Sequence, residues 1–178
     1  MNATLTYIYL TIFHFGSVSL TDEPSASATL NAVRTAKSKG SIISYDPNYR
    51  ARLWHSETEA VEKMKEPLPL VDIIKVSDEE LPLLTGSTDL EKGSEILSSY
   101  GIKLVLVTLG AEGVYYRRGE TTGSLAGIKV TVGDTNGAGD SFFGAVLAGL
   151  SRFEKPLEVG ADELVSVLDF ANHAAALT

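Results

Sequence analysis

The sequence contains no cysteine among its 178 residues. This absence excludes a disulfide framework, a thiolate metal site and a cysteine nucleophile. It is compatible with a reducing compartment, and we expect a cytoplasmic protein. A long apolar run is also absent, because Thr, His and Ser interrupt the most apolar segment, residues 5–20, and no basic stretch precedes it. The segment suits a buried strand better than a membrane span or a signal peptide, so no membrane partner is expected.

Positive charge is scarce as well. The chain has 15 Lys and Arg against 23 Asp and Glu, and its formal net charge is −8 at pH 7. An acidic surface repels a phosphate backbone, which argues against a nucleic-acid partner. It does not exclude a nucleotide, because backbone N–H groups can hold phosphates locally. With 44% hydrophobic residues and no internal repeat or linker, residues 1–178 are expected to form a single domain.

Short apolar segments alternate with segments of helical periodicity along the chain. Strands are predicted at residues 12–20, 41–45, 71–76, 104–109, 113–118, 121–125 and 128–132. Helices are predicted at residues 22–39, 57–65, 78–84, 90–100, 137–150 and 162–176. This alternation predicts an α/β, doubly wound fold in which helices flank a mostly parallel sheet. Ligands of such folds bind at the carboxyl ends of the strands.

The segment that enters the predicted helix 137–150 is rich in small residues. Gly137, Ala138 and Gly139 precede Asp140 there. Small residues let a ligand approach the backbone, and the first N–H groups of a helix are free to hold an anion. Asp140 has two interpretations, a carboxylate that only stabilises the helix N-terminus or a general base beside an anion site. The residues by themselves leave both open.

Other polar residues follow the predicted strands. Asp46, Asn48 and Arg50 come after the strand 41–45, where they form either a simple turn or part of a site. Ser77 and Glu80 have the spacing of a helix capping box. His14 lies in an apolar strand and is expected to be a satisfied core residue rather than a metal ligand.

The segment from Asp134 to Asp140, Asp-Thr-Asn-Gly-Ala-Gly-Asp, resembles the C-terminal signature of the PfkB (ribokinase-like) carbohydrate kinases. Segments at residues 13–17, 46–50, 72–77 and 107–113 follow in the family's order and look most like the fructokinase branch. The resemblance implies an ATP-dependent kinase that phosphorylates a sugar hydroxyl, with fructose as the expected sugar. A ribose, nucleoside or 2-keto-3-deoxygluconate kinase is the alternative, and so is a truncated, non-catalytic nucleotide-binding remnant.

The resemblance also assigns roles to the matching residues. Asp140 matches the catalytic base, and the anion hole for the phosphoryl group matches Gly137, Ala138 and Gly139. The positions that line the nucleotide match Thr108, Gly110, Gly113 and Asn172, the last of these near the adenine. ATP is therefore the implied cosubstrate.

The implied ions are magnesium and a monovalent cation such as potassium. Ser77 to Glu80 occupies the place of the family's Asn-x-x-Glu motif, which handles magnesium and phosphate. Glu80 fits this motif, whereas Ser77 departs from the usual asparagine. Asp134 and Asn136 match the family's monovalent-cation loop.

The resemblance covers only the C-terminal portion of the family's fold. Family members carry an earlier half with a lid sheet and a sugar-binding motif, and nothing in this chain matches it. We therefore expect a fold that is incomplete at the N-terminus and a chain with little kinase activity by itself. Its unpaired sheet edge and exposed apolar face also leave a homodimer open.

Overall fold

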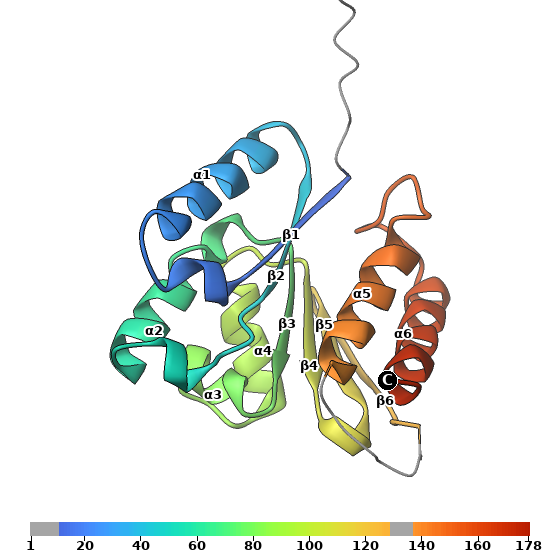
Figure 1. The fold of residues 1–178 in the computed structure, drawn as a ribbon. Coiled ribbons are helices and arrows are strands. Elements are labelled where there is room, and N and C mark those ends of the chain that lie inside the picture. Colours follow the sequence, from blue (N-terminus) through green and yellow to red (C-terminus); the bar gives the residue numbers. More distant parts are fainter. Residues whose placement is uncertain (1–10, 129–136) are drawn as a thin grey trace, which may run out of the picture.

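A computed structural model describes residues 11–128 and 137–178, and its centre is a six-stranded sheet (Figure 1). The strands lie side by side in chain order: β1 Ile12–Gly16, β2 Ile42–Asp46, β3 Ile73–Ser77, β4 Leu104–Thr108, β5 Val114–Arg118 and β6 Thr121–Leu125. Strands β1 to β4 pair in parallel, and β5 and β6 add on as antiparallel neighbours. The predicted, mostly parallel sheet is confirmed.

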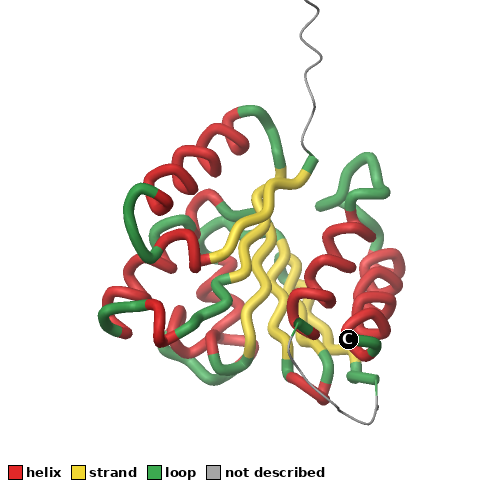
Figure 2. The backbone as a smooth tube through the Cα atoms, viewed as in Figure 1, coloured by secondary structure: helices red, strands yellow, loops and turns green. Residues whose placement is uncertain are grey.

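Helices cover both faces of this sheet (Figures 1 and 2). One face carries α1 Ser25–Ser38, α2 Glu57–Lys65, α3 Glu80–Thr85 and α4 Leu90–Ser98. The other face carries α5 Ala138–Leu150 and α6 Ala161–Ala176. Because β1 to β4 advance in one direction across the sheet and crossovers between parallel strands are right-handed, their connecting helices share one face. No helix of the described residues is both long and apolar enough to cross a membrane.

Strand residues alternate between two separate cores. Ile43 and Tyr45 of β2 belong to the core under α1–α4, whereas Leu104 and Leu106 of β4 belong to the core under α5 and α6. Both faces of the central strands are therefore removed from water, which explains why these strands read as nearly continuous apolar runs. The same alternation decides which polar side chains face α5.

The predicted strand 12–20 was too long. The strand ends at Gly16, and Ser17–Leu20 forms a 3₁₀ helix. The backbone N–H and the hydroxyl of Ser17 both donate to the carbonyl oxygen of Pro47, which pulls the chain out of the sheet. Three further 3₁₀ helices, Ala51–Leu53, Leu68–Leu70 and Gly110–Glu112, were not predicted. The predicted strand 128–132 lies almost entirely outside the described residues.

Residues close in the sequence fix the ends of several helices. Helix α2 has the predicted bounds, and the side chain of Ser56 caps it by accepting a hydrogen bond from the backbone N–H of Glu59. Gly86 closes α3 in the left-handed conformation, at φ 73°, as glycine does most easily. Asp89 caps α4 through the backbone N–H of Lys92. Each of these helix ends depends on residues only a few positions apart, so it is fixed by local sequence.

Candidate active site

A buried ion pair lies at the carboxyl ends of β2 and β3, on the face covered by α5. Because Tyr45 of β2 pairs with Ile74 of β3, the next residues along each strand, Asp46 and Lys75, come side by side. The Nζ atom of Lys75 lies 2.7 Å from Oδ2 of Asp46, and the two side chains are only 8% and 5% exposed. Asp46 also accepts the backbone N–H of Asn48 on its other oxygen, at 3.1 Å.

The N-terminus of α5 is built as an anion site requires. Gly137 has φ 85°, a left-handed conformation that glycine adopts without strain, and the helix begins at the next residue. The first helical hydrogen bond runs from the N–H of Ser141 to the carbonyl oxygen of Gly137, at 2.8 Å. The preceding N–H groups, of Ala138, Gly139 and Asp140, have no intrahelical acceptor and carry the positive end of the helix dipole.

This helix end sits against the buried ion pair. A Cβ atom added to Gly139 would lie 3.3 Å from Nζ of Lys75, so the ammonium is in contact with the first turn of α5. Of the three predicted anion-hole residues, Ala138 and Gly139 are half-buried and Gly137 is exposed. The structure thus brings the small residues of the predicted anion hole next to a cation from β3.

The Asp140 side chain is exposed in the first turn of α5. Within the described residues, its carboxylate takes part in no hydrogen bond or ion pair. It therefore differs from Ser56 and Asp89, whose oxygens accept hydrogen bonds from their own helices. Helix capping by hydrogen bonding does not account for Asp140, although its charge still favours the helix dipole.

Electrostatic effects connect Asp140 with the groups around it. Burial raises the pKa of Asp46 from 3.8 to about 6, Lys75 opposes this shift, and the carboxylates of Glu80 and Asp140 add to it. Partial burial lowers the pKa of His14, the charge of Asp140 opposes that shift, and Lys75 adds to it. Each pKa shift has the direction expected when a titratable group is buried away from water or lies near another charge.

The expectation of a core position for His14 was wrong. The residue is only partly covered, and its side chain reaches solvent from β1, which is an edge strand of the sheet formed by the described residues. Its ring stands edge-on to Phe143 of α5, with centroids 5.3 Å apart, and its Nδ1 atom lies 3.0 Å from the Ser44 hydroxyl. His14 therefore lies on the same face of the sheet as the ion pair.

Glu80 joins two loops at the carboxyl end of the sheet. Its Oε2 atom accepts the N–H of Ser77 at 2.9 Å, and the Ser77 hydroxyl accepts the N–H of Glu80 at 3.1 Å. This reciprocal pair confirms the capping-box spacing. The Oε1 atom of Glu80 accepts the N–H of Tyr49 at 2.6 Å. A link between α3 and the turn after β2 could not be seen from local spacing.

The predicted nucleotide-lining residues converge beside β4. Gly113 has φ 103°, and a Cβ atom there would lie 2.1 Å from the carbonyl oxygen of Leu125. The buried Asn172 donates from Nδ2 to the carbonyl oxygen of Ala126 at 3.2 Å. Both residues therefore have a packing role around the end of β6 that sequence analysis missed. Thr108 ends β4, and Gly110, at φ 55°, follows in the next turn.

The two residues predicted to hold a monovalent cation are not placed by the structure. Asp134 and Asn136 lie outside the described residues.

Among residues 11–128 and 137–178, no group of three or more acidic or His side chains is placed to hold a metal ion. Lys75 was not singled out, although a lone lysine inside the apolar run 71–76 was a usable signal, since lysine is rarely buried without a partner.

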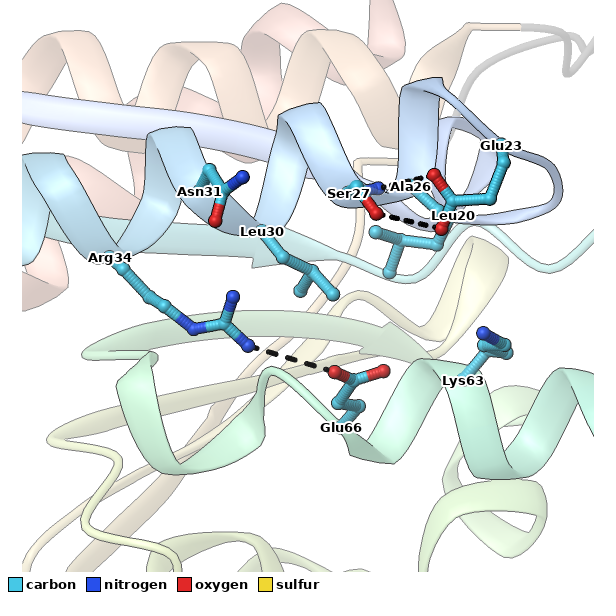
Figure 3. A pocket seen from close by; sticks show the side chains of 9 residues that line it. All are labelled: Leu20, Glu23, Ala26, Ser27, Leu30, Asn31, Arg34, Lys63 and Glu66. Carbon is cyan, nitrogen blue, oxygen red and sulfur yellow. Dashed lines mark hydrogen bonds and ion pairs between the residues drawn. The ribbon is translucent and has the colours of Figure 1, made fainter.

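A separate pocket of about 220 Å³ lies between α1 and α2, across the sheet from α5 (Figure 3). Arg34 and Glu66 face each other there, with NH2 and Oε1 3.8 Å apart and both side chains about half exposed. A surface pair of this kind contributes little, about 0–1 kcal/mol. None of the predicted site residues lines this pocket.

Known proteins resemble this chain in sequence and in fold. The model of the "pfkB family carbohydrate kinase" matches residues 9–178. Fructokinase-2 of Solanum lycopersicum is 42% identical over 168 residues, and fructokinase of Solanum tuberosum is 44% identical over 168 residues. Each alignment covers 94% of this chain but only 51% and 49% of the relative, so the chain spans about half the length of these proteins.

Solved structures show the same relationship. A double-mutant fructokinase from Vibrio cholerae O395, with fructose, ADP and a potassium ion bound, superposes with a TM-score of 0.87 at 32% identity, over 93% of this chain and 53% of its own. Aminoimidazole riboside kinase from Salmonella enterica, bound to aminoimidazole riboside and an ATP analog, gives 0.83 at 31% identity, over 93% and 55%. This chain therefore belongs to the pfkB family of carbohydrate kinases.

Proposed function

We propose that the chain forms the nucleotide-binding half of an ATP-dependent sugar kinase whose acceptor is fructose. One observation carries the proposal: the exposed carboxylate of Asp140 stands beside helix N–H groups that have no intrahelical acceptor, at the carboxyl ends of the parallel strands. The fructokinase names of the relatives, and the fructose and ADP in a similar solved structure, support the choice of substrates.

The chemistry follows from these groups. Asp140 accepts the proton of the sugar hydroxyl as that oxygen bonds to the γ-phosphorus of ATP. The bond from that phosphorus to the bridging oxygen breaks, and ADP leaves with the bonding electrons. The N–H groups at the start of α5 face the negative charge on the transferring group, where preorganised donors are most effective.

Magnesium, when bound, neutralises charge on the phosphates. Glu80 is the described residue that would hold it. Both oxygens of Glu80 already accept backbone N–H groups, but a carboxylate oxygen keeps a second lone pair. Magnesium retains several waters, so contact through water fits this buried carboxylate. Asp134 and Asn136 are proposed to hold a monovalent cation, and a potassium ion is present in a similar fructokinase.

The rest of the proposal concerns partners and place. We propose a cytoplasmic protein without a nucleic-acid partner, in keeping with its net charge of −8.

A homodimer is proposed because Phe170 of α6 is 61% exposed beside a groove between α5 and α6. A nucleoside acceptor is the second candidate, because aminoimidazole riboside kinase superposes almost as well as the fructokinases.

A coupled assay of ADP release tests the proposal. It compares the 178-residue chain with a version extended by the N-terminal half of a fructokinase, using fructose and a nucleoside as acceptors. We expect transfer to fructose by the extended protein, little by the chain itself, and loss of transfer in Asp140→Asn. ATP binding without transfer in every version would instead favour a non-catalytic remnant.

A further inference from the structure

Lys75 is a buried cation that has a single neutralising partner in the described part of the chain. Its side chain is 8% exposed, and among the described residues only Asp46 accepts a hydrogen bond from its ammonium group. An ammonium group has three N–H donors, so two remain available. Removing such a charge from water is costly, and one ion pair often fails to repay that cost. The arrangement therefore indicates a role beyond stability.

The position of the ammonium shows which ligand it would serve. It lies against Gly139, where an added Cβ atom would be 3.3 Å from Nζ. The free N–H groups at the start of α5 lie in the same place. A phosphate group held by those N–H groups would meet the positive charge of Lys75 as well, in surroundings that screen charges poorly.

A second lysine–aspartate pair at the opposite end of β3 provides a comparison. Nζ of Lys37 lies 2.7 Å from Oδ2 of Asp72, the same distance as in the first pair. The Lys37 side chain is 36% exposed, however, and it joins the end of α1 to the start of β3. This pair joins a partly exposed lysine to a buried aspartate at the opposite end of β3, whereas the pair of Asp46 and Lys75 lies beside the start of α5.

We propose that Lys75 supplies positive charge to the anion site at the start of α5, and that Asp46 is a positioning residue that holds the Lys75 ammonium there. The inference rests on the proposed function and deepens it by assigning the ligand of this cation as the terminal phosphate of a nucleoside triphosphate. Before the ligand arrives, Asp46 balances the buried charge. When the phosphate is bound, Lys75 bridges Asp46 and the phosphate oxygens through its separate N–H donors.

Calorimetric titration of the 178-residue chain with ATP and with adenosine tests this assignment. We expect Lys75→Met to weaken ATP binding by about tenfold or more, as for loss of a charged hydrogen bond, and to leave adenosine binding unchanged. Lys37→Met removes the same charge from the second lysine–aspartate pair and should leave the affinity for both ligands unchanged. The double variant Asp46→Asn/Lys75→Met leaves no unpaired charge, so it should fold and still show the selective loss of ATP affinity.

The outcomes separate this inference from the proposed function. Unchanged ATP affinity in Lys75→Met and in the double variant would overturn the role of Lys75 while the kinase proposal stands. An equal loss of ATP and adenosine affinity would show a structural role only, which also overturns it. If the unsubstituted, folded chain bound neither ligand, the proposed function would fail and this inference with it.

Discussion

Glu80 and Tyr49 are joined by a hydrogen bond in which the backbone N–H of Tyr49 donates to Oε1 of Glu80 at 2.6 Å. The same carboxylate also accepts the N–H of Ser77, so one buried side chain holds the turn after β2 against the start of α3. Both segments carry candidate site residues, and the alignment of the site therefore depends on this carboxylate.

Replacement of Glu80 by alanine should destabilise the chain by about 3 kcal/mol, because two N–H groups lose a charged acceptor in a buried place. Urea unfolding followed by circular dichroism measures this change. Glu79→Ala, at the exposed neighbouring position, should stay within about 0.5 kcal/mol of the unsubstituted chain. Equal midpoints for the two variants would show that Glu80 does not hold the turn.

Asp140→Asn should lower kcat of the extended kinase by a factor of about 10²–10⁴, because the proton acceptor is lost. ATP affinity should change little, since the α5 N–H groups and Lys75 remain. Steady-state kinetics and calorimetric titration measure the two effects separately. A parallel loss of ATP affinity would assign Asp140 to binding rather than to proton transfer.

Gly113→Ala should be among the most destabilising substitutions in the chain. The residue has φ 103°, and the new Cβ atom would lie 2.1 Å from the carbonyl oxygen of Leu125, which is backbone and cannot yield easily. Gly101 has a similar φ of 97° but nothing within 4 Å, so Gly101→Ala isolates the conformational cost of about 1 kcal/mol. Urea unfolding should place Gly113→Ala well beyond that value, and similar losses would contradict the close approach.

The raised pKa of Asp46 predicts a pH dependence of stability. The pKa of Asp46 is about 6 in the folded chain, whereas its ordinary pKa is 3.8. The folded state therefore holds the Asp46 proton more tightly than the unfolded state does. The stability that this proton binding contributes is therefore complete when the pH lies below the ordinary pKa of 3.8. It decreases by up to about 3 kcal/mol as the pH rises through the folded pKa of about 6.

Urea unfolding of the unsubstituted chain and of Asp46→Asn, from pH 4 to 6.5, isolates this effect from other carboxylates. The free energy of unfolding of the unsubstituted chain should fall relative to the variant as pH rises. Lys75→Met should steepen the fall, because Lys75 is the group that opposes the shift in the Asp46 pKa. Parallel curves for the chain and Asp46→Asn would show that Asp46 titrates normally.

Local signals in the sequence were sufficient for most elements and for the location of the site. The cap at Ser56 and the glycine at Gly86 mark helix ends through neighbours a few residues away. The apolar periodicity of the segments predicted a doubly covered sheet, and Gly137 to Asp140 marked the start of α5. All of these depend on short-range geometry that residue type controls.

Only the tertiary structure decided which segments far apart in the sequence contact one another. Lys75 meets Asp46 across 29 residues because parallel pairing of β2 and β3 brings their carboxyl ends together. Ser17 leaves the sheet because its N–H donates to the carbonyl oxygen of Pro47, which directly follows β2. The sequence by itself determined most of the elements and their order, and it marked the candidate anion-binding residues at the start of α5. Which charges lie beside that candidate site was decided by strand register, which no local pattern of residues encodes.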